Sequence, residues 1–255
     1  MRSALFVTGL DDMLHPGLAQ AAMKLLRRLG VDAELPAQQD CRHWKRSEFG
    51  HRDEMARLIH HFVETFDGYD EIIVPSASRG GLPSEAYEVA ADSVGDLGLL
   101  MDVQGIASRM HELTKYLTDR MGAPDLGAFF PHRVAYHRAC RGLRATGPGE
   151  RPYELLRQVK GIDLVEFSAH GECGDFPTPG GGDDGSRALD TGAHVVVAVE
   201  SSCLLHTGTW SARDGRAMRN LHVVEILARA EEDGPLDGVP LSGAEVAAAS
   251  GLLGR

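Results

Sequence analysis

The chain of 255 residues is long enough to bury a large core, as one large domain or as two lobes of ~125 residues. Its 43% hydrophobic and 25% charged residues are typical of a soluble globular protein, and its formal net charge of -11 argues against a nucleic-acid partner. No run approaches ~18 apolar residues and the N-terminus does not resemble a signal peptide, so we expect a cytoplasmic protein without a membrane span. Its four cysteines are then expected to be thiols.

Strands and helices alternate along the first half of the chain. Residues 4–9 are expected to form a buried strand that runs into a turn, and residues 15–30 a helix with Pro16 in its first turn and Gly30 at its end. A short strand over 32–35 leads toward Cys41. The other elements expected here are a helix over 48–66, a strand over 71–78, a helix beginning at 83 and a longer helix over 102–122.

The same alternation restarts after residue 132 and predicts an α/β fold. The expected elements are a strand over 133–140, a helix over 153–161, strands over 162–168 and 194–203, and a closing helix over 217–230. Strands that alternate with helices indicate mainly parallel sheets. We therefore expect two tandem pseudo-repeated α/β lobes, over residues 1–127 and 128–230, with a peripheral tail over 231–255.

The two halves can be laid over each other, and the alignment gives the cysteines a pattern. Gly9, at the end of the first strand, falls opposite Cys140. Gly9 is separated from Cys41 by 32 residues, and Cys140 from Cys173 by 33. Arg79 falls opposite Cys203.

Three cysteines of the second half are therefore expected to converge. Cys140, Cys173 and Cys203 each follow a predicted strand. In a parallel α/β sheet the carboxyl ends of the strands face one edge, and ligands bind there. The alternative, in which these residues are three unrelated buried thiols, stays open.

The chain resembles the cysteine-rich CCG-domain family of iron–sulfur proteins, which acts in lactate utilisation, glycolate oxidation and heterodisulfide reduction. The resemblance runs from about residue 3 to 230 and covers two tandem repeats. The matching segments, in chain order, are LFVTGLDDMLHPGLAQAAMKLLRRLG, LPAQQDC, VPSAS, AYHRAC, HGECG, ESSCLLH and LHVVEILA. The family implies an iron–sulfur cluster in each complete repeat, and electron transfer with a hydroxyacid dehydrogenase partner or a disulfide substrate.

The first repeat departs from the family pattern and is expected to hold no cluster. Gly9, Arg42 and Arg79 stand where the family has cysteines, and Cys41 alone remains. One thiolate beside two arginines cannot replace the roughly four cysteine ligands that a cluster needs. An anion site at Arg42 and Arg79 stays open as an alternative.

The second repeat keeps most of the family's ligand set. Cys140, Cys173 and Cys203 match family cysteines, whereas Glu172 replaces the first member of the cysteine pair. Three thiolates and one further ligand suit either a [4Fe–4S] cluster or a single iron or zinc ion. The candidates for the further ligand lie within three residues of a site cysteine: His137, His170, Glu172 and His206.

Three functions are compatible with this reading. The first is a cytoplasmic iron–sulfur or related metal-binding protein of the lactate-utilisation type. It would act in redox chemistry on a small 2-hydroxy acid, as an oxidoreductase or as a subunit of a hydroxyacid-oxidising complex. The second is a stand-alone metalloenzyme with an open iron or zinc at the same site. The third is a metal-free scaffold subunit.

Overall fold

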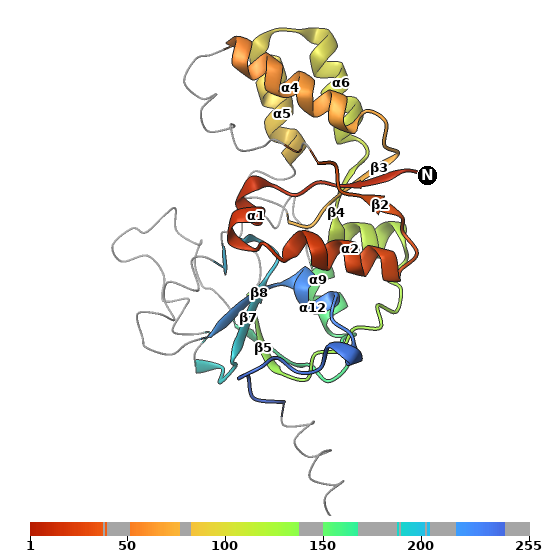
Figure 1. The fold of residues 1–255 in the computed structure, drawn as a ribbon. Coiled ribbons are helices and arrows are strands. Elements are labelled where there is room, and N and C mark those ends of the chain that lie inside the picture. The colour runs from red at the N-terminus through yellow and green to blue at the C-terminus, as the bar shows by residue number, and fades with distance from the viewer. Residues whose placement is uncertain are drawn as a thin grey trace, which may run out of the picture. The chain divides into compact units, whose positions relative to one another are not determined.

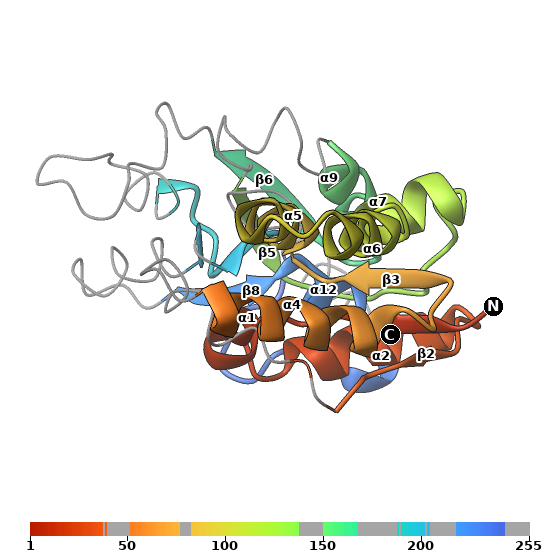
Figure 2. The same ribbon diagram turned by 90° about the horizontal axis from the view of Figure 1, so that it is seen from above.

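A computed structural model describes residues 1–37, 39, 52–76, 83–137, 150–167, 188, 190–201, 203–204 and 218–242 of the chain. The chain divides into two compact units, Met1–Gly122 and Ala123–Arg255. Each contains a four-stranded sheet in which every described strand pair is parallel. Helices lie beside the strands in both units (Figure 1 and Figure 2). The expected fold class of two α/β lobes with parallel sheets is therefore confirmed.

The first sheet has the strand order β2-β1-β3-β4. Its strands are β1 (Ser3–Leu5), β2 (Ala33–Glu34), β3 (Glu71–Val74) and β4 (Met110–Glu112). The two central strands, β1 and β3, are buried along their whole length, as expected for strands that helices cover on both faces. The described helices of this unit are α1 (Gly9–Leu14), α2 (Leu18–Arg28), α4 (Arg52–Phe66), α5 (Pro83–Val94), α6 (Leu97–Ala107), α7 (Leu113–Lys115) and the π-helical turn η1 (Tyr116–Arg120).

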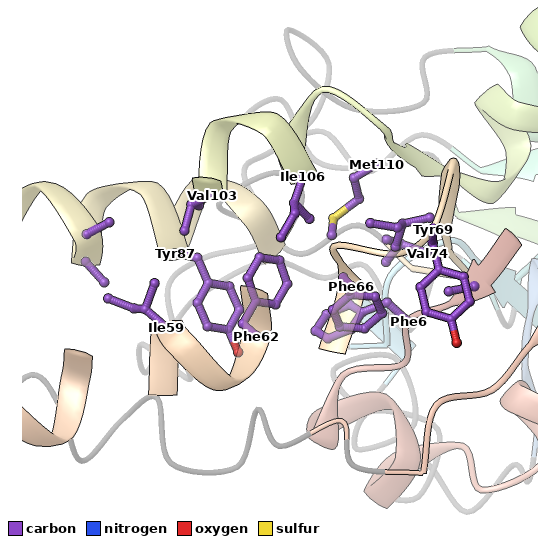
Figure 3. Packing of buried hydrophobic residues seen from close by; sticks show 14 of the residues in the cluster. Phe6, Ile59, Phe62, Phe66, Tyr69, Val74, Tyr87, Val103, Ile106 and Met110 are labelled. Carbon is purple, nitrogen blue, oxygen red and sulfur yellow. The ribbon is translucent and has the colours of Figure 1, made fainter. Parts of the chain in front are cut away.

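An aromatic core joins α4, α5 and α6 to one face of the first sheet (Figure 3). Phe62 of α4 stacks on Tyr87 of α5 with the ring centroids 4.0 Å apart. Phe6, directly after β1, meets Phe66 edge-on at a centroid distance of 5.1 Å. Aromatic pairs in these geometries add about 0.5–1.5 kcal/mol to the stabilisation from burial alone. This face of the first lobe is thus filled by large apolar side chains.

The second sheet has the strand order β6-β5-β7-β8. Its strands are β5 (Arg133–His137), β6 (Asp163–Phe167), β7 (Val195–Ala198) and β8 (Arg219–His222). The described helices of this unit are α9 (Arg151–Leu156), α12 (Val223–Leu227) and the 3-10 helix η2 (Glu231–Asp233). After η2 the chain hydrogen-bonds back to this lobe, because the Leu236 N–H donates to His132 Nε2 and the Ser242 N–H to the Pro131 carbonyl oxygen, both at 2.8 Å.

The two sheets have the same topology. Strands β1, β2, β3 and β4 occupy the places in their sheet that β5, β6, β7 and β8 occupy in theirs. Ser3 of β1 pairs with Ala33, and Val134 of β5 pairs with Leu164, so 30 residues separate the partners in both lobes. The internal repeat is therefore present in the fold as well as in the sequence.

The strand registers also define which residues are equivalent. Glu112 and His222 are the last residues of β4 and β8, and each caps the helix that follows at once. Glu112 pairs with Val74 of β3, and His222 pairs with Ala198 of β7. These pairs give the same alignment on which the matched cysteine positions depend.

Two expected helices are wrong, at the same place in each repeat. The segment 102–122 contains the end of α6, then strand β4, then α7 and η1. The segment 217–230 begins with strand β8 and becomes helical only at α12. In both repeats a strand of three or four residues passes directly into a helix without a glycine or proline between them. Apolar spacing continues across this junction, so the short strand has the pattern of a helix.

Candidate metal site at the carboxyl edge of the second sheet

The structure describes two of the residues predicted to bind metal, Cys203 and His137. The other members of that site lie outside the described residues, and they are Cys140, Cys173, His170, Glu172 and His206. The first-repeat positions Cys41, Arg42 and Arg79 lie outside them as well. The geometry around Cys203 is therefore the structural evidence on this site.

The sequence predicted that Cys203 ends a strand over 194–203. In the structure Cys203 lies instead in a helical turn beyond β7. Strand β7 ends at Ala198, and the backbone N–H groups of Cys203 and Leu204 both donate to the carbonyl oxygen of Glu200, at 3.1 and 3.2 Å. The side chain of Cys203 carries a thiol and is 3% exposed. It packs with small apolar residues on one face of the second sheet, and these include Ala135, Ala188, Ala193, Val196 and Ala198.

Glu200 places a buried carboxylate beside this thiol. The Sγ atom of Cys203 donates a hydrogen bond to Oε2 of Glu200 at 3.4 Å, and the Glu200 residue is 4% exposed. Residues three apart are neighbours on a helical turn but point to opposite faces of a strand. The sequence pattern predicts a strand here, which would put Glu200 and Cys203 on opposite faces, so Glu200 is not among the predicted site residues.

His222 is committed to the backbone and does not act as a ligand in this arrangement. Its Nε2 lies 2.6 Å from the Val199 carbonyl oxygen, which can only accept, and its Nδ1 accepts from the Val224 N–H at 3.2 Å. The His222 N–H donates in turn to the Glu225 carboxylate at 2.7 Å, which completes a capping box. The side chain thus ties the end of β7 to the start of α12.

Two more polar residues lie on the face of the sheet against which Cys203 packs. His137 is buried at the end of β5, and the alternation along the strand puts it on the same face as Ala135. Asn220 of β8 pairs with Val196, and its Nδ2 donates to the Leu204 carbonyl oxygen at 3.2 Å. The Oδ1 of Asn220 is buried and has no hydrogen-bond partner among the residues that the structure describes.

The order of the strands brings the starts of three cysteine-bearing segments together. Strand β5 lies between β6 and β7, and neighbouring strands are about 4.8 Å apart. Cys140 follows the last residue of β5 by three positions, Cys173 follows that of β6 by six, and Cys203 follows that of β7 by five. The three segments thus leave adjacent strands at the same edge of one sheet.

At the carboxyl edge of the first sheet, polar side chains hold the backbone. Helix α1 begins at Gly9, and its cap Thr8 accepts through its hydroxyl from the Asp11 N–H at 3.2 Å. The side-chain oxygen of Gln39 accepts from the Val7 N–H at 2.7 Å, so it links the segment before Cys41 to the end of β1. Gly9, where the family has a cysteine, is therefore the first residue of a capped helix.

Glu112 is a further buried carboxylate at this edge, and it has a capping role. Its two oxygens accept hydrogen bonds from the backbone N–H groups of Thr114 and Lys115 and from the Thr114 hydroxyl, at 2.6–3.0 Å. Burial raises the pKa of Glu112, and the three donors oppose that increase. All of these contacts close the first turn of α7, so the capping role accounts for the burial of Glu112 at this edge.

Among the described residues, no three His, Cys, Asp or Glu side chains are grouped in a way that could hold a metal ion. Only one of the three cysteines of the predicted site, Cys203, is among these residues. In the same parts of the chain, no helix is both long and apolar enough to cross a membrane.

The fold and the residues around Cys203 define a class of protein. It has two α/β lobes, each with a parallel sheet, and a buried thiol–carboxylate pair in the second lobe. No protein-family model matches the chain. Among curated proteins, it is similar to "Lactate utilization protein A" of Oceanobacillus iheyensis, with 27% identity over 249 residues that cover 92% of this chain and 99% of the relative. It is also similar to "Lactate utilization protein A 1" of Bacillus cereus strain AH820, with 29% identity over 242 residues that cover 89% and 98%.

A comparison with solved structures adds nothing to this relationship. The chain aligns with an ABC transporter solute-binding protein from Conexibacter woesei at 14% identity, over 91% of this chain and 72% of the other. The TM-score of 0.30 is too low to carry an argument on fold or function.

Proposed function

We propose that the chain is an iron–sulfur or related metal-binding protein of the lactate-utilisation type, with one metal site in its second lobe. The observation that carries the proposal is the sheet order β6-β5-β7, because the segments with Cys173, Cys140 and Cys203 follow these three neighbouring strands. Similarity to proteins named lactate utilization protein A over about nine-tenths of the chain supports the same assignment.

The described residues fit a site for a soft metal centre. Cys203 offers a buried thiol, and thiolates select iron–sulfur clusters or zinc over magnesium or calcium. Asn220 adds a buried oxygen without a partner among the described residues, and such atoms are rare in a closed core. Cys140, Cys173 and Cys203 would hold the metal, with a further ligand from the sequence candidates His170, Glu172 or His206.

The distances along the chain also fit. A segment of n residues spans at most about 3.6 Å × n, so Cys140 stays within about 11 Å of the end of β5. The strand ends themselves are neighbours in the sheet. Three thiols can therefore approach one another without any change in the described strands.

The protein's own residues would position the ligands and limit the access of water. Two backbone hydrogen bonds to the Glu200 carbonyl oxygen fix the turn that carries Cys203, and the amide of Asn220 holds the next residue, Leu204. Burial of Cys203 keeps water from its sulfur. A bound cluster would supply one-electron transfer at this position.

The role that follows is redox chemistry on a small 2-hydroxy acid, as an oxidoreductase or as a subunit of a complex that oxidises such acids. We place the protein in the cytoplasm and expect it to work with other subunits. The first lobe would then have a structural role and would not bind a metal, because Thr8 and Glu112 at its carboxyl edge cap helices.

Anaerobic purification of the full chain tests the metal assignment. An iron–sulfur protein would be brown, with an absorption band near ~400 nm and roughly four irons and matching sulfide per chain. One zinc or iron per chain without sulfide would instead identify a stand-alone metalloenzyme. Protein without metal would contradict the proposal and leave the scaffold as the remaining function.

Deletion of the gene tests the metabolic role separately. The deletion strain is expected to grow slowly on lactate as sole carbon source and normally on glucose, and the wild-type gene should restore growth on lactate. Unchanged growth on lactate would contradict a role in lactate utilisation.

A further inference from the structure

We infer that the exposed face of the helical hairpin α5–α6 in the first lobe is a docking surface for a basic protein partner. The partner would present apolar side chains flanked by lysines and arginines, as one face of an amphipathic helix does. The inference is independent of the metal site, because it concerns the other lobe and requires none of the cysteines. It rests on exposed apolar side chains, on the charge of the hairpin and on one exposed glycine.

One face of the hairpin is buried in the first lobe. Helices α5 and α6 lie side by side (Figure 1 and Figure 2), and only Gly95 and Asp96 separate them in the sequence, so they run in opposite directions. Tyr87 of α5 and Val103 and Ile106 of α6 belong to the aromatic core (Figure 3). This face thus holds the hairpin to α4 and to the sheet.

The other face of the hairpin exposes large apolar side chains. Leu97 and Met101 are four residues apart and so lie on one side of α6, where they are 75% and 70% exposed. Val89 of α5 is 70% exposed and lies two positions from the buried Ala91, on the opposite side of that helix. Val89 precedes Gly95 by six positions and Met101 follows it by six, so both lie at the same height along the hairpin. A group of exposed apolar side chains at one place marks an interaction site.

Helix α6 is apolar on both of its sides. Its 11 residues contain a single charged side chain, that of Asp102. A helix that is apolar all round is expected where both of its sides are covered. The aromatic core covers one side, and no other described element covers Leu97 and Met101, which are more than two-thirds exposed. A partner would supply the missing cover.

The hairpin is also strongly acidic. Residues 83–107 contain five carboxylates and no lysine, arginine or histidine, so they account for -5 of the formal net charge of -11. These carboxylates belong to Glu85, Glu88, Asp92, Asp96 and Asp102. Within the described parts of the chain, the exposed Glu85, Asp92 and Asp102 form no ion pair. An apolar centre with an acidic surround is complementary to an apolar centre with a basic surround.

This charge decides against other occupants of the face. A second copy of the chain would bring two hairpins of charge -5 together, and like charges disfavour such a pairing. Nucleic acids and anionic lipid surfaces are negatively charged as well, so the hairpin would repel them. A basic protein surface is the occupant that fits both the charge and the apolar side chains.

Gly105, in the last turn of α6, has no packing role within the lobe. A Cβ atom at this position would have no atom within 4 Å apart from its chain neighbours and the helix backbone. Alanine would therefore fit, and it favours a helix more than glycine does. Gly105 is exposed and follows Met101 by four residues, so it lies on the same side of α6. A glycine there lets the backbone of a partner approach the helix closely.

The hairpin is an addition of the first repeat. The connection from β3 to β4, over 75–109, has 35 residues, whereas the one from β7 to β8, over 199–218, has 20. Helices α5 and α6 have 12 and 11 residues, so the connection in the second repeat is too short to contain both. A partner that recognises the hairpin would thereby distinguish the two lobes.

Binding of a designed peptide to the full-length protein tests the inference. The probe is a fluorescein-labelled helical peptide of about 18 residues, in which lysines flank a stripe of leucines. Its counterpart carries glutamate at every lysine position. In fluorescence anisotropy the wild type is expected to bind the lysine peptide at least ~10-fold more tightly than the glutamate peptide.

Variants locate the binding on the hairpin. The double variant Leu97→Ser/Met101→Ser should bind the lysine peptide at least ~10-fold more weakly than the wild type. The matched control is Met13→Ser, which changes a side chain of α1 that is 71% exposed, and it should bind like the wild type. Gly105→Ala should leave the urea midpoint unchanged or raise it, yet weaken peptide binding by about threefold or more. A purely structural glycine would give a lower midpoint and unchanged binding.

Several results would overturn the inference. One is that the wild type binds both peptides equally or binds neither. Another is that Met13→Ser weakens binding as much as the double variant, because the net charge of the chain would then hold the peptide. A dimer that Met101→Glu dissociates in sedimentation would assign the face to a second copy. Should a variant fail to fold, hydrogen exchange of the wild type decides: the peptide should protect α5 and α6, and protection confined to other elements would contradict the assignment.

Discussion

The same face of the two sheets carries large aromatic side chains in the first lobe and small apolar and polar side chains in the second. In the first lobe it carries an aromatic core in which Phe62, Tyr87 and Phe66 pack over β1 and β3. In the second lobe the corresponding strand positions are smaller or polar. The equivalent pairs, first lobe before second, are Phe6 and His137, Val74 and Ala198, Met110 and Asn220, and Glu112 and His222.

This difference shows how one topology can serve two purposes. Large apolar side chains fill the first lobe and stabilise it by burial. The second lobe gives up part of that apolar surface and keeps a thiol and a carboxylate in direct contact. Such a departure from a uniform apolar core is expected where a protein binds a ligand.

The largest expected effect comes from the aromatic core. Phe62→Ala removes a ring that stacks on Tyr87 at 4.0 Å, and it should lower the free energy of unfolding by about 3–5 kcal/mol. Urea denaturation measures this loss, and Phe62→Leu provides a milder control. Metal content per folded chain should stay at the wild-type value. A loss below about 1 kcal/mol would contradict the packing that gives the first lobe its stability.

A substitution at β8 tests the contribution of a polar residue on this face of the second lobe. Asn220→Met introduces the residue that the first lobe has at the equivalent position, and it removes the hydrogen bond to Leu204. Because that bond steadies the residue next to Cys203, metal affinity should fall by about 10–100-fold. The matched variant Met110→Leu in the first lobe should leave affinity unchanged. Equal affinities for both variants and wild type would show that Asn220 has no part in the site.

The two lobes should also respond to pH in opposite directions, which is the smallest of these effects. Burial lowers the pKa of His132, whose Nδ1 donates to the Pro240 carbonyl oxygen while its Nε2 accepts from the Leu236 N–H. Its contribution to stability is present above its ordinary pKa, near 6.5, and is lost as the pH falls through the lowered value. Burial raises the pKa of Glu112, so its contribution is present at low pH and is lost as the pH rises through the raised value.

Hydrogen exchange at several pH values can measure this contrast for each lobe. After correction for the intrinsic pH dependence of amide exchange, acidification below pH 6.5 should lower the protection factors around residues 236–240, and His132→Gln should reduce that dependence. Acidification should raise the protection factors at the start of α7, and Glu112→Gln should reduce that change as well. The same pH dependence in wild type and both variants would contradict these assignments.

The sequence was sufficient for the architecture because it carries the same strand–helix alternation twice. The spacing of 30 residues between paired positions in β1–β2 and in β5–β6 reflects that repeat. Strand β4 was missed because Val103, Ile106, Met110 and Leu113 keep helical spacing across it. Local periodicity does not distinguish a three-residue strand from a turn of helix, and only pairing with β3 decides between them.

The candidate site was predictable in part. The position of Cys203 after β7 follows from the alternation of elements, whereas the partner Glu200 depends on a helical turn that the strand pattern concealed. Asn220 has no sequence signal of its own, because its role comes from its place in β8 beside Leu204. The arrangement of Cys140 and Cys173 stays a prediction.

Metal analysis of two cysteine variants tests the central claim most directly. Iron, zinc and sulfide are measured per chain in anaerobically purified wild type, in Cys203→Ala and in Cys41→Ala, which removes the cysteine that remains in the first repeat. We predict that the wild type and Cys41→Ala contain the same metal and that Cys203→Ala contains little or none. Equal loss in both variants, or no metal in the wild type, would contradict a single metal site in the second lobe.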